Sequence, residues 1–305
     1  KPRPAEIDEW THFLHDAGNN AVARDKRIGP PRHMQYLSDP LWSRHHDKLA
    51  SISSVVTARG RIFYIRDRGP VYEPAFPARW SVVARDAFNG VFLWKRDIES
   101  WTSNRRGFRS GPVQIARLLV TDGDRVFAPL GLDEPVSVLD ARTGDVRRTL
   151  DKTAGAEEIV CFDGTLFVQV GTQGAEHALI ENKKKGVDYK TTKAIAAANP
   201  DDGTLLWRYP ASGAAAIMPR TLAAAKEGVF FQENGAVICL DRENGAERWR
   251  KQIAPAAKPD RDRQKKGKQN KRKKKSRGRS MGWTFETLVV TGGTVLYSDN
   301  RNLYA

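Results

Sequence analysis

The stretch Ala197-Ala-Asn199-Pro-Asp-Asp-Gly203-Thr-Leu-Leu-Trp207 decides the fold, because its pattern occurs four times in the 305-residue chain. The shared frame is eleven residues long, with a small or apolar first residue, Asp or Asn third, Gly seventh and Trp eleventh. Only the second copy departs from it, having Arg148 in the last position. The residues that fill the frame are Asp86, Gly90 and Trp94; Asp140 and Gly144; Asn199, Gly203 and Trp207; and Asp241, Gly245 and Trp249.

Each copy of the frame predicts a β-hairpin. An extended stretch ends at the Asp or Asn, whose side chain can accept hydrogen bonds from backbone N–H groups of the turn. The glycine then supplies the residue with positive φ that such a turn requires. A second strand follows the turn and carries the tryptophan.

A second pattern lies upstream of each frame and predicts a further hairpin. Two apolar residues precede a turn, and an apolar residue with Phe or Leu follows it, in units that begin at Val55, Leu119, Ile159, Leu222 and Val289. Two successive hairpins make a four-stranded antiparallel sheet. Because the frame glycines are 54, 59 and 42 residues apart, the sequence predicts an all-β propeller with about five blades.

The frame resembles the tryptophan-docking repeat of the pyrroloquinoline quinone (PQQ) quinoprotein propellers, over roughly residues 50–305. The stretch Trp10-Thr-His-Phe13-Leu-His-Asp16, with Pro30-Pro31 and Leu41-Trp42, also resembles the lead-in before the first blade of such proteins. The resemblance implies that Trp94, Trp207 and Trp249 pack between neighbouring blades. They are thus expected to build the fold and not to form a catalytic set.

These patterns divide the chain into a lead-in, residues 1–49, and a propeller, residues 50–305. We expect blades at approximately 50–98, 113–151, 157–210, 220–253 and 283–305. The last unit ends at Asn302-Leu303-Tyr304-Ala305 and lacks the Asp, Gly and Trp of the frame. Because propellers close by pairing first and last blades, we expect an incomplete fifth blade in a fragment that lacks about two or three blades.

The positive charge of the chain is concentrated in one segment. The net charge is +15, and Lys258–Arg279 contributes +11 of it, from 13 basic and 2 acidic residues. This segment has no apolar residue, so we expect a disordered, solvated insert between the Trp249 strand and the blade that begins near Trp283. A passive insertion is the favoured interpretation. Binding of an anionic partner, such as nucleic acid, through counterion release is the alternative.

Five of the six histidines lie within the first 46 residues. A helix over Glu6–Ala17 would place His12 and His15 together on its polar face. With Asp16, or with His45, His46 and Asp47, they could offer a transition metal imidazole and carboxylate ligands. We favour the other interpretation, in which hydrogen bonds hold these side chains and no metal site is formed.

The resemblance also raises an enzymatic hypothesis. Quinoprotein dehydrogenases hold PQQ over the propeller axis beside a vicinal disulfide and a calcium ion. In this chain Cys161 and Cys239 are 78 residues apart, which excludes a vicinal pair and leaves a single disulfide open. No CxxCH haem motif or calcium motif is present.

Other candidate acids and ligand-binding residues fit loops. Asp122, Asp163 and Glu157-Glu158 are interpreted as turn residues. The stretch Trp101–Arg109 joins two blades and places an aromatic and three arginines on a loop, where propellers often bind ligands. An anionic ligand there and a solvated loop both remain open.

The sequence favours a non-catalytic scaffold or binding module with a protein partner. The alternative is a PQQ-dependent dehydrogenase that oxidises an alcohol or sugar, with PQQ and calcium in a site completed by missing blades. The residues themselves identify no cofactor. No apolar run approaches the 18 or so residues of a transmembrane helix. The resemblance implies a periplasmic or other extracytoplasmic location.

Overall fold

The computed structural model describes residues 4, 6–27, 29, 32–38, 52–70, 76, 78–99, 101, 113–131, 134–171, 193–233, 235–253, 288–298 and 303–305. The predicted all-β propeller is confirmed, since the described strands form four four-stranded sheets and a fifth of three strands. The basic segment Lys258–Arg279 and the residues His45, His46 and Asp47 lie outside the described residues.

The first two blades are antiparallel meanders. The first contains β1 (Ile52–Ala58), β2 (Arg61–Asp67), β3 (Trp80–Asp86) and β4 (Phe92–Ile98). A 3-10 helix, η1 (Val113–Leu118), precedes the second. That blade contains β5 (Val120–Thr121), β6 (Arg125–Pro129), β7 (Val136–Asp140) and β8 (Val146–Leu150).

The remaining blades repeat this order. A short 3-10 helix, η2 (Asp151–Thr153), leads into β9 (Ala156–Phe162), β10 (Thr165–Val170), β11 (Ala194–Ala198) and β12 (Leu205–Tyr209). The fourth blade contains β13 (Ala223–Ala225), β14 (Gly228–Glu233), β15 (Ala236–Leu240) and β16 (Glu247–Gln252). The fifth contains β17 (Leu288–Thr291), β18 (Thr294–Ser298) and β19 (Leu303–Tyr304).

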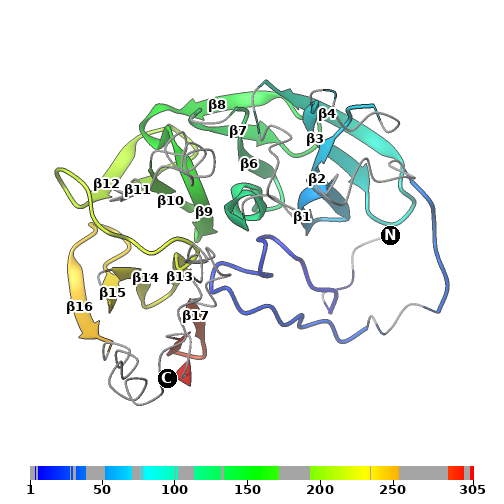
Figure 1. The fold of residues 1–305 in the computed structure, drawn as a ribbon. Helices are drawn as coiled ribbons and strands as arrows, with labels where there is room; N and C mark the ends of the chain where they lie inside the picture. The colour runs from blue at the N-terminus through cyan, green and yellow to red at the C-terminus, as the bar shows by residue number, and fades with distance from the viewer. Residues whose placement is uncertain are drawn as a thin grey trace, which may run out of the picture.

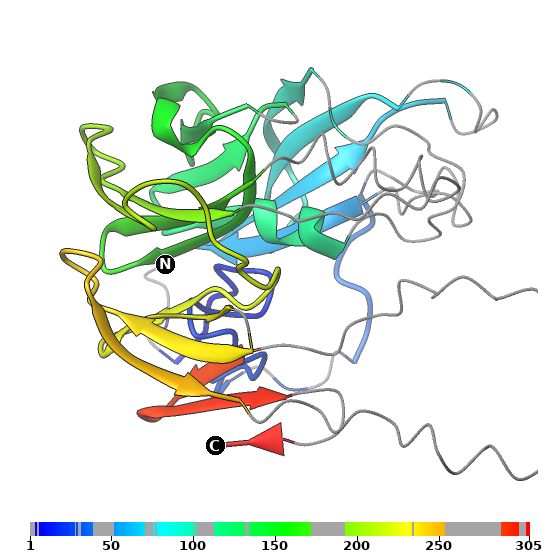
Figure 2. The same cartoon turned by 60° about the vertical axis from the view of Figure 1, so that its left-hand side comes forward.

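The blades follow one another around an arc (Figure 1). Their first strands β1, β5, β9, β13 and β17 contact each other in turn and surround the axis. The fourth strands β4, β8, β12 and β16 lie on the outside of the arc, and Figure 2 shows the sheets from the side. The N-terminal segment, dark blue in both views, crosses the centre of the arc.

The frame has a simple structural meaning, because its first and last residues face each other across the hairpin. Ala84 pairs with Trp94, Val138 with Arg148, Ala197 with Trp207 and Cys239 with Trp249. A small or apolar first residue leaves room for the large residue opposite. In the turn, Asp86 Oδ1 accepts hydrogen bonds from the backbone N–H groups of Phe88 and Asn89, at 2.9 and 3.0 Å.

The buried core lies between neighbouring sheets. Phe63, Phe127, Phe167 and Phe231, which end the upstream patterns, are fully buried. A buried phenylalanine side chain stabilises a fold by about 1.5–3 kcal/mol through the area it removes from water. The upstream hairpins thus supply the inner part of the core.

The frame tryptophans lie on the outer strands, and Trp94 and Trp207 each pack against the turn of the following blade. Trp94 Nε1 donates to the Ala141 carbonyl at 3.1 Å, and Trp207 Nε1 donates to the Arg242 carbonyl at 2.7 Å. Both side chains are buried. Trp249, on the outer strand of the fourth blade, is 40% exposed.

Candidate functional site at the propeller axis

The inner edge of the propeller presents one backbone N–H group from each blade. Each group belongs to a residue in the first strand of its blade, two positions before the turn that leads to the second strand. That residue pairs with the one that lies two positions after the turn. An edge strand carries such unpaired donors and needs them covered. The five residues are Thr57, Thr121, Cys161, Ala224 and Val290.

The N-terminal segment Trp10–Asn20, here called the axial segment, accepts a hydrogen bond from every one of these donors. Thr57 and Thr121 donate to the carbonyls of Trp10 and Thr11 at 2.7 and 3.0 Å, and Cys161 donates to His12 Nε2 at 3.0 Å. Ala224 and Val290 donate to the carbonyls of Ala17 and Gly18, at 2.9 and 2.7 Å. The axial segment therefore contacts all five described blades.

His12 is the only one of these acceptors that is a side chain. Its Nε2 atom accepts from Cys161, so we assign the proton to Nδ1, which lies 2.8 Å from Thr11 Oγ1. Burial and the neighbouring His15 lower the pKa of His12 to about 3. The imidazole is thus neutral at physiological pH, as an acceptor must be.

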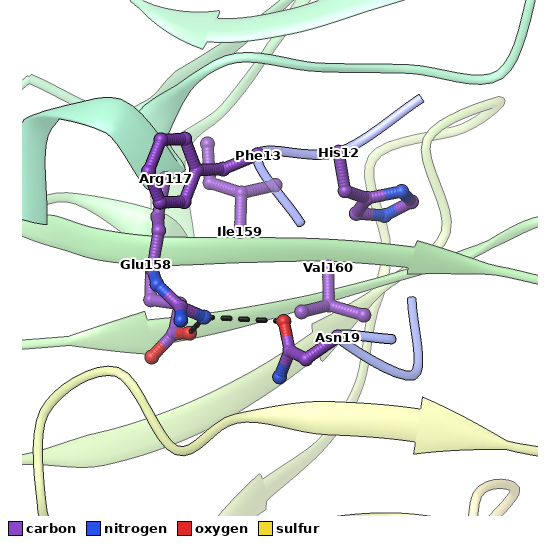
Figure 3. Close-up of a pocket in the computed structure, with 7 residues that line it drawn as sticks. All are labelled: His12, Phe13, Asn19, Arg117, Glu158, Ile159 and Val160. Carbon is purple, nitrogen blue, oxygen red and sulfur yellow. Dashed lines mark hydrogen bonds and ion pairs between the residues drawn. The ribbon is translucent and has the colours of Figure 1, made fainter. Parts of the chain in front are cut away.

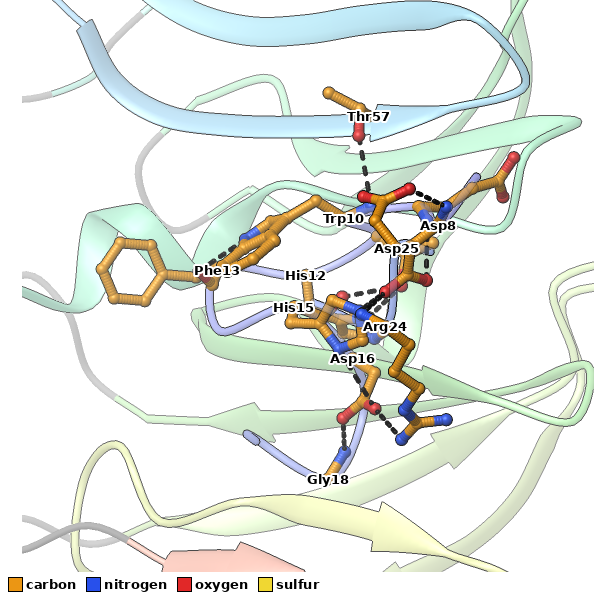
Figure 4. A network of polar contacts seen from close by, with 12 residues as sticks. Asp8, Trp10, His12, Phe13, His15, Asp16, Gly18, Arg24, Asp25 and Thr57 are labelled. Atoms are coloured by element: carbon orange, nitrogen blue, oxygen red, sulfur yellow. Dashed lines mark hydrogen bonds and ion pairs between the residues drawn. The ribbon is translucent and has the colours of Figure 1, made fainter. Parts of the chain in front are cut away.

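A second layer of polar contacts holds the axial segment in its own shape (Figure 4). His15 Nε2 lies 2.6 Å from Asp8 Oδ2, and the same oxygen accepts from the backbone of Arg24 at 2.5 Å. Asp16 accepts from the backbone of Gly18 at 2.9 Å and pairs with the Arg24 side chain at 3.0 Å. The loop is therefore closed on itself by carboxylates.

The prediction of a helix over Glu6–Ala17 is wrong. This stretch contains turns and isolated bridges, and both His12 and His15 are buried. The physical reason is that carbonyl groups inside a helix are occupied by the helix itself. The free N–H groups of the inner strands require open carbonyls, which an irregular loop provides.

No group of three His, Cys, Asp or Glu side chains that could hold a metal ion occurs among the described residues. His12 and His15 are instead engaged with the third blade and with Asp8. The second predicted set, His45, His46 and Asp47, falls in the part of the chain for which no structure is described.

A buried polar cluster lies beside the axial segment and joins three blades to η1. Arg117 of η1 donates to Glu158 Oε1 at 2.5 Å and to Asn19 Oδ1 at 3.1 Å. Asn19 Nδ2 in turn donates to the carbonyls of Leu222 and Leu288, at 2.8 and 3.2 Å. Because all three side chains are buried, each needs its partners to offset the loss of water.

The interpretation of Glu157 and Glu158 as turn residues is wrong, because both lie within β9 and are buried. Burial raises the pKa of Glu158, and Arg117 acts against this shift. Glu157 faces the other side of the strand and pairs with Lys193, while Gln169 Nε2 donates to it at 3.2 Å. Adjacent strand residues point to opposite faces, so the two glutamates serve two separate contacts.

The cavity at this place is small. His12, Phe13, Asn19, Arg117, Glu158, Ile159 and Val160 line about 10 Å³ of free space, roughly the room for one water molecule (Figure 3). Ligand pockets usually have about 300–1,000 Å³. A tricyclic quinone such as PQQ therefore does not fit between these residues.

The side chains of the other residues singled out in the sequence do not line this cavity. Cys161 and Cys239 are free thiols, and burial raises the pKa of Cys161 to about 12. Trp101 is buried in the core and so presents no aromatic surface to a ligand. Its neighbours 102–110, including three arginines, lie outside the described residues. The repeat residues of the frame belong to the outer hairpins, far from the axis.

The fold and the arrangement around the axis define a β-propeller of PQQ-like repeats. A family model described as outer membrane protein assembly factor BamB matches residues 122–302. That match spans more than half of the chain, and the chain belongs to this family.

Two solved structures share the fold. The quinohemoprotein alcohol dehydrogenase from Comamonas testosteroni superposes with a TM-score of 0.50 at 13% identity, covering 81% of this chain and 41% of that one. A europium-containing methanol dehydrogenase gives a TM-score of 0.50 at 10% identity, covering 82% of this chain and 50% of that one. The chain thus spans half of their length or less.

No curated protein sequence matches the chain. Within the described residues, no helix has the length and apolar character needed to cross a membrane.

Sequence reasoning missed Asn19 and Arg117, which hold the polar cluster together. Arg117 carried a signal, because it interrupts the apolar run Ile115–Val120. A lone charge in such a run needs a buried partner, and Glu158 in the next apolar stretch supplies it. Asn19 gave no signal, since asparagine is common in loops.

Proposed function

We propose that this chain acts as a non-catalytic scaffold or binding module. One observation supports the proposal most directly: the chain's own axial segment accepts a hydrogen bond from the inner strand of each of the five described blades, and the described cavity beside it has room for about one water molecule. The place where a propeller usually holds a ligand is therefore used to tie the blades together.

The proposed partner is a protein, and the proposed location is extracytoplasmic. Both follow from membership of a family described as outer membrane protein assembly factor BamB. The alternative is a PQQ-dependent dehydrogenase that oxidises an alcohol or sugar, with PQQ and calcium in a site that further blades complete. The buried cluster of Arg117, Glu158 and Asn19 does not favour it, since these groups already bind each other.

Titration calorimetry of PQQ with calcium into the protein, expressed from its natural start to its natural stop, tests this proposal. We expect no saturable heat from a sample whose cooperative thermal unfolding shows that it is folded. A quinoprotein dehydrogenase stripped of its cofactor serves as the positive control. Calcium-dependent one-to-one binding to that protein would overturn the proposal and favour the dehydrogenase alternative.

A further inference from the structure

Neighbouring blades in this protein share a repeated contact, here called the turn slot. A slot consists of the frame glycine of one blade and the carbonyl of the residue after the frame Asp. A Cβ atom added to Gly144 would lie 2.5 Å from the Trp94 ring, and one added to Gly245 would lie 2.7 Å from the Trp207 ring. The Nε1 atoms of the same tryptophans donate to the Ala141 and Arg242 carbonyls.

The slot of the first blade consists of Gly90 and the Ala87 carbonyl, and a residue of the lead-in fills it. A Cβ atom added to Gly90 would lie 2.5 Å from the Tyr36 ring. The Tyr36 hydroxyl donates to the Ala87 carbonyl at 3.3 Å. Both contacts match those of Trp94 and Trp207, although Tyr36 belongs to no described strand.

A second contact fixes the lead-in on the same turn. Gln35 Nε2 donates to the Phe88 carbonyl at 2.6 Å. Gly90 has φ +74°, a conformation that glycine adopts at no steric cost. The turn therefore presents a flat glycine surface and two open carbonyls to the lead-in.

At the third-blade frame glycine, Gly203, the non-aromatic Arg148 takes the corresponding place, with its Cδ atom 3.0 Å from an added Cβ atom. We propose that Tyr36 is the residue that seals the first blade, and that the first-blade slot prefers an aromatic side chain with a hydrogen-bond donor at its edge. A flat ring covers the glycine, and the donor at its rim satisfies the carbonyl. While Tyr36 occupies the slot, a tryptophan from another blade or from a second copy cannot bind there. The lead-in is thus the built-in partner of this face.

Substitutions of Tyr36 in the full chain test the selectivity of the slot. We expect Tyr36→Ala to lower the thermal midpoint by about 2–4 °C, as the loss of about 1 kcal/mol does in a domain of this size. Tyr36→Trp should retain the midpoint, because an indole offers both a ring and a donor. Tyr36→Phe should fall between them.

Hydrogen exchange supplies a local readout that a general loss of stability would not give. In Tyr36→Ala, amides of the first-blade turn Ala87–Val91 should exchange faster, while those of the equivalent turn Ala141–Asp145 should not change. Equal acceleration at both turns, or no acceleration at Ala87–Val91, would overturn the proposal.

A double substitution tests the contact itself. Gly90→Ala introduces both backbone strain and overlap with the Tyr36 ring, whereas Gly164→Ala, with φ +77° and open space around it, introduces strain alone. In the otherwise unchanged chain, Gly90→Ala should lower the thermal midpoint more than Gly164→Ala does. In a chain that already carries Tyr36→Ala, the two glycine substitutions should lower the midpoint equally. Additive shifts would show that the ring and the glycine do not interact.

Discussion

His12 shows how one residue can replace a backbone acceptor. Four blades donate to carbonyls of the axial segment, whereas the third donates to the imidazole. This contact requires the neutral form of the side chain, so it couples the third blade to pH.

Acidification should therefore weaken the fold through His12. Its folded pKa of about 3 lies below the ordinary value of 6.5, so the unfolded chain binds more protons between these two pH values. The stabilisation is complete above about pH 6.5 and is lost as the pH falls toward 3. The loss approaches about 1.4 kcal/mol per pH unit within this window.

Denaturant unfolding of the chain and of His12→Gln, measured between pH 7 and pH 4, checks this prediction. Glutamine offers a neutral acceptor that does not titrate, so the variant should have a shallower pH dependence. The matched control is His33→Gln, because His33 is exposed. The same pH slope in all three proteins would contradict the assignment.

At the scale of elements, the close approach between the axial segment and β17 leaves no space for a larger residue. The Gly18 carbonyl accepts from Val290, and a Cβ atom added to Gly18 would overlap the Val290 carbonyl oxygen. The contact therefore depends on glycine for its space.

We predict that Gly18→Ala destabilises the chain by about 1–3 kcal/mol, the usual cost of overpacking. The effect should be local, with faster hydrogen exchange in β17 than in β1. Gly29→Ala is the control, since nothing lies near an added Cβ atom there. Unchanged exchange in β17 would show that this strand does not depend on the axial segment.

The sequence predicted the strands well and the axis poorly, for physical reasons. Hairpins are local, and the frame from Ala197 to Trp207 contains its own turn signal and its own cross-strand pair. The axial segment has no such local pattern, because its partners lie in five separate strands. Its apolar spacing predicted a helix, but hydrogen bonds to distant strands hold it as an irregular loop. Glu158 and Arg117 likewise pair only after the blades have come together.

At the scale of the whole molecule, charge and fold are separate properties. The segment Lys258–Arg279 carries +11, and the remaining 283 residues carry only +4 of the total of +15. The sequence left passive insertion and anionic binding as the two interpretations of this segment.

Deleting residues 258–279 should leave the thermal midpoint unchanged, because a segment without apolar residues supplies nothing to a hydrophobic core. Elution from a heparin column should move to lower salt, since fewer counterions are released on binding. A variant with the 13 basic residues changed to serine separates charge from length. Unchanged elution after deletion would remove the anionic partner from consideration, and a lower midpoint would show that the segment supports the fold.

The axial segment also constrains how the protein forms during synthesis. Asn19 bonds to the Leu288 carbonyl, 269 residues further along the chain. At roughly 5–20 residues per second, the ribosome needs about 13–54 s to make that partner after Asn19 itself has been made. During this time each blade emerges with its inner edge only partly covered. The axial segment is made before the five described blades but completes its contacts only with the fifth, so nascent chains need protection from edge-to-edge association until that blade has left the ribosome.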